Sequence, residues 1–158
     1  MALKSLRSHL ESEIGFFFDA TAERGGIAVL KTVGSGDGMD QSVAVAEYAA
    51  TSSGKMPIGV LMNDVVNIDL TRQKLNPYKD EVQINTKVCL WSKGDVETNW
   101  LLPGITVSMG DRAYLGPSGY ITNADLGANA TPIVGYFKSS KDEDGFAKVA
   151  VNLPMARS

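Results

Sequence analysis

The sequence predicts a mainly β protein: a compact β-barrel or β-sandwich preceded by an amphipathic N-terminal arm. Short apolar runs recur at intervals of about 8 to 12 residues, and glycine or proline stands at most of the breaks between them. A clear helical period occurs only near the N-terminus. The length of 158 residues suits one domain with an arm. We therefore assign residues 1–24 to the arm and residues 25–158 to the β domain.

The first eighteen residues contain a helical spacing of aliphatic side chains, followed by a cluster of aromatic ones. Four aliphatic residues follow one another at steps of three, four and four, which predicts an amphipathic helix over residues 3–14. Gly15 offers a stop, and three consecutive phenylalanines follow, which are costly to leave in water. The surface that covers these side chains is either the protein's own core or a neighbouring subunit or larger partner. The candidate contact residues are Leu3, Leu6, Leu10, Ile14, Phe16, Phe17 and Phe18.

From residue 25 onward the pattern changes to short strands. Apolar runs predict strands at residues 27–30, 43–49 and 58–62. The clearest alternation of apolar and polar side chains covers residues 82–90, which predicts a strand with one face in water. The polar stretch at residues 63–80 lacks a continuous apolar stripe, so we expect a long surface loop there, with at most a turn of helix.

The second half of the chain shows the same alternation of apolar runs and turn residues. Two Gly-Asp pairs, Gly94-Asp95 and Gly110-Asp111, each lie between apolar runs and predict tight turns. Further turns are predicted at residues 101–104, 116–119 and 141–145, and strands at residues 133–137 and 147–153.

The composition argues against several classes of function. Fifteen Lys and Arg against eighteen Asp and Glu give a net charge of −3, so free nucleic acid is not an expected partner. The single cysteine, Cys89, cannot form an intrachain disulfide or a Cys-based zinc site. The single histidine, His9, lies in the arm, which argues against a Ser-His-Asp or Cys-His hydrolase. The sequence has neither a signal peptide nor a membrane span, so we expect synthesis in the cytoplasm and no membrane partner.

Three polar segments resemble functional motifs without matching them. The glycine-rich segment at residues 34–38 has no Lys-Ser or Lys-Thr pair at P-loop spacing, so we interpret it as a hairpin tip. The acidic segment at residues 142–145 lacks the ligand ladder of a calcium loop and is interpreted as a solvated turn. Asp64 and Asp69 could form an acid and base pair, but a polar loop also needs aspartates for solubility. We therefore expect no enzyme activity, no cofactor and no metal.

Four aromatic residues leave two interpretations open. Trp91, Trp100, Tyr114 and Tyr120 could form a platform on which a sugar stacks, or they could anchor the core and an interface. The first interpretation keeps a carbohydrate-binding or receptor-binding β module as the alternative function.

The layout from residue 25 to residue 154 resembles the capsid decoration (cement) proteins of tailed bacteriophages. The resemblance depends on the opening strand after Gly25-Gly26, the segment at residues 58–61, the two Gly-Asp turns, and the closing segments at residues 133–137 and 145–151. It covers about four fifths of the chain, through the order of turns and strands rather than an invariant motif.

This resemblance implies a β-barrel or β-tulip-like domain that forms a homotrimer. Such a trimer sits on the outer surface of the capsid head, at threefold and quasi-threefold positions, and stabilises the expanded shell of the major capsid protein. It implies no active site. The arm would then reach across capsid subunits through the contact residues named above, and the protein would be localised on the virion.

Overall fold

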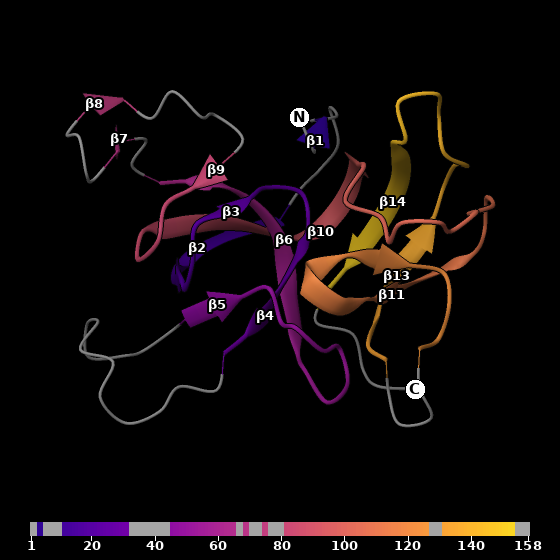
Figure 1. Ribbon diagram of the computed structural model, residues 1–158, viewed down its shortest axis with the longest axis horizontal. Helices are drawn as coiled ribbons and strands as arrows, with labels where there is room; N and C mark the ends of the chain where they lie inside the picture. Colours follow the sequence, from indigo (N-terminus) through magenta and orange to yellow (C-terminus); the bar gives the residue numbers. More distant parts are fainter. Residues whose placement is uncertain are drawn as a thin grey trace.

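The computed structural model describes residues 11–31, 45–65, 81–126 and 131–153 in full, and the backbone of residues 3–4, 68–69 and 74–75. The chain is mainly β, as the sequence predicts (Figure 1). In this described part, the helical structure is limited to one short 3-10 turn, η1 (Pro117–Gly119). No helix among these residues has the length and apolar character needed to cross a bilayer.

One large sheet contains ten of the strands, in the order β12-β11-β13-β14-β10-β2-β5-β4-β6, with β1 also paired to β10. Two small two-stranded sheets join β3 to β9 and β7 to β8. The strands are β1 (Leu3–Lys4), β2 (Glu11–Phe18), β3 (Ala22–Glu23), β4 (Ile27–Leu30), β5 (Val45–Glu47), β6 (Pro57–Asp64), β7 (Ile68–Asp69), β8 (Lys74–Leu75), β9 (Glu81–Val82), β10 (Lys87–Thr98), β11 (Arg112–Leu115), β12 (Ile121–Thr122), β13 (Ile133–Phe137) and β14 (Ala147–Asn152).

The long strand β10 connects the two halves of the large sheet. Its first half pairs with β2 along one edge and with β6 along the other, and its second half pairs with β1 and β14. Register shifts in the β2 pairing, between Val88 and Leu90 and between Trp91 and Lys93, mark β-bulges that bend the strand. Figure 1 shows β2, β4 and β5 on one side of the molecule and β11, β13 and β14 on the other, with β6 and β10 between them.

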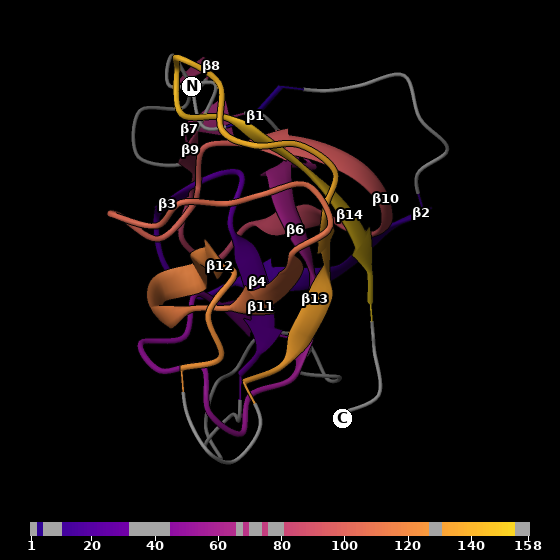
Figure 2. The ribbon, with the colours of Figure 1, turned by 90° about the vertical axis from the view of Figure 1, so that its right-hand side faces the viewer.

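The strands β10, β2, β5, β4 and β6 form a ring of pairings, because β6 pairs back to β10. A cluster of buried side chains that includes Phe18, Leu61 and Leu90 packs on these strands. A second and larger cluster, which includes Phe137, Val149 and Leu153, packs beneath β11, β13 and β14. Figure 2 shows β13 and β14 side by side.

The helix predicted for residues 3–14 is wrong in the described part. Leu3–Lys4 is a strand, and Glu11–Phe18 forms an antiparallel pair with β10 and a parallel pair with β5. The helical spacing of the aliphatic residues is overridden because the segment following it, with three phenylalanines, pairs with a long strand and buries Phe18.

Two further predictions around β10 are wrong. The strand expected at residues 82–90 is interrupted by a turn at Ile84 and Asn85, where Asn85 adopts a φ of 62° and Ile84 is 49% exposed. The turn expected at Gly94-Asp95 does not exist, because Gly94 pairs with Val151 and Asp95 pairs with Ala150 inside the β10–β14 ladder. Lys138 Nζ forms an ion pair with Asp95 Oδ2 at 2.7 Å, so the Asp95 side chain stabilises the sheet instead of a turn.

The other predicted strands and turns are confirmed where the structure describes them. Strands lie at residues 27–30, 133–137 and 147–152. The strand at residues 45–47 is shorter than predicted, and the strand at residues 57–64 is longer. Turns lie at Pro103-Gly104, at Gly110 and at residues 143–145. The predicted loop at residues 63–80 starts two residues later than expected, because Asn63 and Asp64 end β6, and it contains the short antiparallel pair of strands β7 and β8, which the sequence does not predict. The glycine-rich segment at residues 34–38 lies outside the described residues.

Candidate interaction surface

The aromatic candidates of the N-terminal segment lie on the ring of strands. Phe18 is 1% exposed inside the cluster that packs on the ring, and the half-buried Phe16 packs against that cluster. Lys87 Nζ lies 5.5 Å from the centroid of the Phe17 ring, a cation–π distance. For Phe16 and Phe18 the covering surface is therefore the protein's own core.

The aliphatic candidates are placed less completely. Ile14 is 57% exposed on β2 and lies on the surface. Only the backbone of Leu3 is described, where it pairs with Thr98. Leu6 and Leu10 lie outside the described residues. The structure thus leaves Ile14 as the candidate whose side chain is described and is available to a partner.

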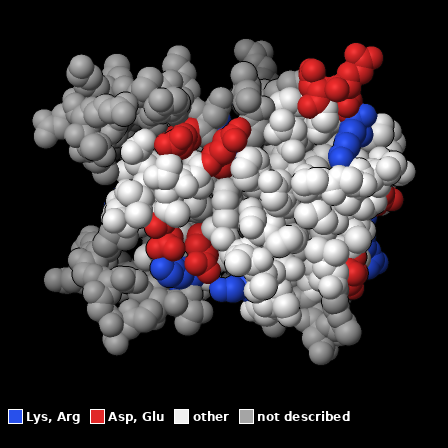
Figure 3. All heavy atoms as spheres, viewed as in Figure 1, with Lys and Arg blue, Asp and Glu red and all other residues white. Residues whose placement is uncertain are grey.

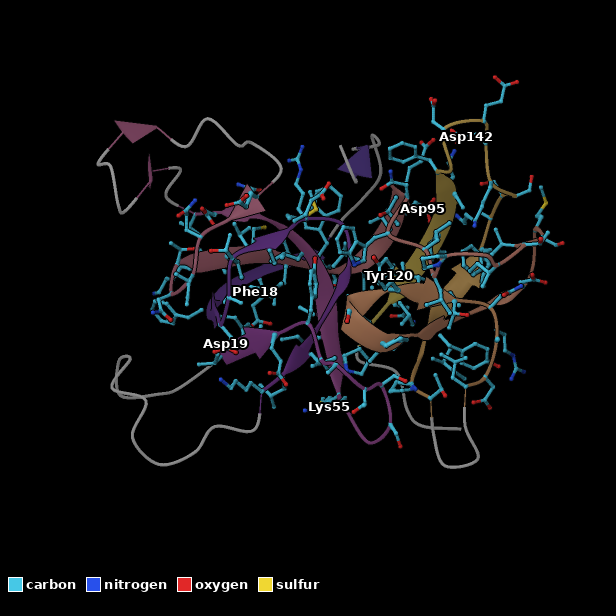
Figure 4. The ribbon with its side chains drawn as sticks, in the orientation of Figure 1. Phe18, Asp19, Lys55, Asp95, Tyr120 and Asp142 are labelled. Atoms are coloured by element: carbon cyan, nitrogen blue, oxygen red, sulfur yellow. The ribbon has the colours of Figure 1, made fainter. Side chains whose placement is uncertain are left out.

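Two of the four aromatic residues of the possible sugar platform come together in a stack. The rings of Trp100 and Tyr120 are stacked at 5.1 Å between centroids, and the ring of Tyr48 is also stacked with Trp100, at 5.9 Å. The half-buried Trp91 packs instead against the larger core cluster. Figure 4 shows Tyr120 near the middle of the molecule, between the two groups of strands.

This aromatic stack is built into the fold. The Tyr48 hydroxyl accepts a hydrogen bond from Gly26 N at 3.1 Å and donates one to Glu23 O at 2.8 Å, and burial raises the pKa of the Tyr48 phenol far above its ordinary value. A Cβ added at Gly26 would lie 2.5 Å from Trp100 Cδ1, so glycine is needed for the rings to approach the backbone. Sequence reasoning missed Tyr48, since it is 52 residues from Trp100 and no local pattern links them.

Asp64 is a buried carboxylate at the end of β6, 5% exposed. It accepts a hydrogen bond from Thr86 Oγ1 at 2.9 Å and weaker ones from Gln83 N. Thr86 has one hydroxyl hydrogen, and Gln83 O lies closer to Oγ1, at 2.7 Å. When Asp64 is protonated, its O–H can donate to Thr86 Oγ1 instead, and the Thr86 hydroxyl then donates to Gln83 O alone. Burial raises the pKa of Asp64, and nearby Glu81 raises it further, against the lowering effect of the hydrogen bonds.

We expect Asp64→Asn to mimic the protonated state, because its amide can donate to Thr86 Oγ1 while its carbonyl accepts from Gln83 N. The raised pKa of Asp64 means that its protonation stabilises the folded state, an effect lost as pH rises through that pKa. The variant should therefore gain stability relative to the parent as pH rises from the acid range to 8. Urea unfolding at several pH values measures this trend, and a constant difference would contradict it.

Asp64→Ala is the matched comparison. It leaves the N–H of Gln83 without its acceptor and should cost about 1 to 3 kcal/mol. Only the backbone of Asp69 is described, so the sequence-predicted acid and base pair has one described side chain. Asp64 itself stabilises the turn between β9 and β10 through its hydrogen bonds with Gln83 N and Thr86 Oγ1.

The acidic segment at residues 142–145 forms a self-contained turn. The Asp142 carboxylate accepts hydrogen bonds from Asp144 N at 3.0 Å and from Phe146 N at 2.7 Å. Asp142 therefore satisfies its own loop, as the interpretation of a solvated turn expects. No group of three or more His, Cys, Asp or Glu side chains that could hold a metal occurs in the parts of the chain described here.

A hollow of about 470 Å³ opens on the sheet formed by β11, β13 and β14. Its lining includes the small residues Gly135 and Ala150 and the apolar residues Ile133 and Val151. Tyr136, 51% exposed, and the exposed Arg112 also line it. Tyrosine and arginine are enriched at the centres of protein interfaces. This geometry suits the docking of an apolar side chain that has a negative charge nearby.

The hollow belongs to an extended part of the chain with few charges. Among the forty residues from Thr98 to Phe137, the charged ones are Asp111, Arg112 and Asp125, whereas 21% of the whole chain is charged. Figure 3 shows a broad uncharged area over β11 and its neighbouring loops, with charged side chains at its margins. We call residues 98–137 the low-charge segment. The sequence contains this signal directly, and a count of charges along the chain would have found it.

Exposed apolar side chains project from the low-charge segment. Met109 is 76% exposed, Tyr136 is 51% exposed and Leu126 is 48% exposed. A surface with few charges and several exposed large apolar groups is typical of a protein–protein contact. The arrangement can bind a partner by removing apolar area from water.

Comparison with known proteins adds no family assignment. No protein-family model matches the sequence, and a search of curated proteins found no significant match.

Proposed function

We propose that this chain is a structural virion protein that decorates the outer surface of a phage capsid and stabilises the expanded head. Its partners are the phage major capsid protein and further copies of itself in a homotrimer. The proposal rests on the resemblance in the order of turns and strands, from which one element, the turn at Gly94-Asp95, is missing because the strand continues through it. It is supported by the mainly β fold and, above all, by the low-charge segment with its exposed Met109, Tyr136 and Leu126.

The mechanism needs only binding energy. Burial of apolar surface contributes about 25 cal/mol per Å², and each exposed large side chain that becomes covered adds to the contact. A protein that binds the expanded lattice in preference to the unexpanded one shifts the equilibrium toward the expanded form by mass action. Many copies act together, so a modest affinity per chain reinforces the whole shell.

The alternative function, a carbohydrate-binding or receptor-binding module, receives less support from the aromatic residues. A sugar stacks on an open ring face, but the Trp100 ring already stacks with both Tyr48 and Tyr120. The Trp100 Nε1 also donates to Ser118 O at 3.3 Å. These contacts make the stack a structural link between β5, η1 and the loop after β10.

The direct test is co-sedimentation with purified capsids of the phage whose genome encodes the chain. We expect saturable binding to emptied, expanded capsids and much weaker binding to unexpanded ones. Absence of binding to expanded capsids by the folded protein would overturn the proposal. Saturable quenching of tryptophan fluorescence by a glycan, without capsid binding, would favour the alternative.

A matched pair of variants tests the low-charge segment. Leu126→Lys places a charge at a 48% exposed position inside the segment, and Val65→Lys does the same at a 45% exposed position outside it. We expect Leu126→Lys to weaken capsid binding about tenfold or more, because a lysine must then be desolvated. Val65→Lys should bind like the parent. Equal binding by both variants would remove this part of the segment from the contact.

The N-terminal contact requires a point substitution instead of a deletion. Deleting residues 2–18 removes β2 from the sheet and would unfold the ring of strands. Ile14→Ser changes only an exposed side chain, and Ile84→Ser, at 49% exposure, is its control. If β2 touches the capsid, Ile14→Ser alone lowers occupancy. Unchanged occupancy in the folded variant would exclude Ile14 from the contact.

A further inference from the structure

The hollow on β11, β13 and β14 is lined largely by small and apolar residues. Gly135 and Ala150 contribute at most a methyl group, and Ile133 and Val151 are apolar. An open apolar hollow beside an exposed tyrosine is suited to receive a side chain from another molecule.

The same chain presents a side chain that fits this description. Met109, 76% exposed, stands at the turn before β11. Methionine is unbranched and flexible, so it adapts to irregular apolar spaces. The turn that carries it is fixed to β13, because Gly110 N donates to Phe137 O and Phe137 N donates to Asp111 O, both at 2.8 Å. Met109 is therefore an exposed apolar knob on a well-anchored turn.

The charges beside the knob and the hollow are complementary. Asp111 Oδ2 accepts hydrogen bonds from Ser108 N and Asn123 Nδ2, both at 2.9 Å, which fixes the carboxylate next to the knob and leaves Oδ1 for a further donor. These hydrogen bonds hold the pKa of Asp111 below its ordinary value, so the group is an anion at neutral pH. Arg112, which lines the hollow, forms no ion pair in the described part of the chain.

We propose that copies of this chain associate by placing Met109 of one copy in the hollow of the next, with Asp111 of the first copy against Arg112 of the second. The knob and the hollow are formed by different residues, so a contact in which each copy gives its knob to the next joins copies head to tail, and such contacts close into a ring where the rotation between neighbouring copies allows it. The closed trimer in the proposed function is one such ring. To that extent the inference rests on the proposed function, although association itself needs no capsid.

The test is sedimentation velocity of the purified full-length chain over a range of concentrations, without capsids. We expect the parent to associate into a species larger than one chain. Met109→Ser should weaken the association about tenfold or more, since it removes the knob. Ala150→Lys, on the hollow side, should do the same by placing a charge in the hollow. Met56→Ser is the matched control, because Met56 is a 48% exposed methionine outside the low-charge segment.

The outcomes separate this inference from the proposed function. A parent that stays monomeric at about 100 μM, or that associates equally well with Met109→Ser, would overturn the inference. Loss of association in Met56→Ser to the same degree would also overturn it. If a strictly monomeric chain binds capsids, the proposed decoration function is supported and the contact between Met109 and the hollow is contradicted. If the chain associates but does not bind capsids, that contact is supported and the proposed function is contradicted. Circular dichroism of each variant shows that the sheet is retained.

Discussion

Gly135→Ala is expected to prevent stable folding of the chain. The new Cβ would lie 1.7 Å from the carbonyl oxygen of Ala150 and 2.9 Å from its carbon. Both are backbone atoms of β14, which is held by β13 on one side and β10 on the other, so they cannot move aside. We expect a loss of more than about 4 kcal/mol, a large part of the total stability of a domain. Soluble yield and urea unfolding measure it.

Gly15→Ala is the control for this prediction. At Gly15 the nearest atom to an added Cβ is Glu13 Oε1 at 3.4 Å, which is the end of a flexible side chain. This variant should keep the parent's unfolding free energy within about 0.5 kcal/mol. A Gly135→Ala protein that unfolds at the parent's urea concentration would show that β13 and β14 are not packed as described.

The second large effect is expected for Phe18→Ala. Phe18 is 1% exposed and packs edge to face against Tyr48 at 5.2 Å between centroids. Its removal leaves a cavity in the cluster on the ring of strands and should cost about 3 to 5 kcal/mol. Ile14→Ala, at a 57% exposed position on the same strand, should cost no more than about 0.5 kcal/mol. Urea unfolding of both variants at one protein concentration gives the comparison.

Similar losses for the two variants would mean that β2 does not insert into the ring as described. The predicted difference also limits how the N-terminal segment can contact a partner. Because β2 pairs with both β10 and β5, the residues that follow Ile14 stabilise the fold itself. A partner can reach β2 through its exposed positions only, whatever the partner is.

The sequence predicted the mainly β class because most strands carry their own local signal. Residues 147–153 show a clear example, where Ala147, Val149, Val151 and Leu153 alternate with Lys148, Ala150 and Asn152 and all four are buried. Turns with a backbone requirement were also predictable, as at Gly110, where φ is 93°. Local composition was sufficient in these places because local and tertiary preferences agree.

The sequence-based predictions are wrong where pairing between distant segments determines the local structure. Gly94-Asp95 has the composition of a turn, but the ladder to β14 continues through it. The alternation at residues 82–90 continues across Asn85, and nothing local shows that the chain reverses there. The stack of Tyr48 on Trp100 and the hollow above Gly135 depend on contacts between distant segments, so no pattern along the chain predicts them. The low-charge segment was visible in the sequence and needed only a count of its charges.

The central claim is that the chain reinforces a capsid by surface contact, and the thermal stability of that capsid tests it most directly. Emptied, expanded capsids that lack the chain would be heated with and without a saturating amount of the purified protein, and shell disruption followed by calorimetry. The account predicts a higher disruption temperature with the parent protein and a smaller increase with Leu126→Lys. An unchanged disruption temperature with the folded parent protein at saturation would contradict it.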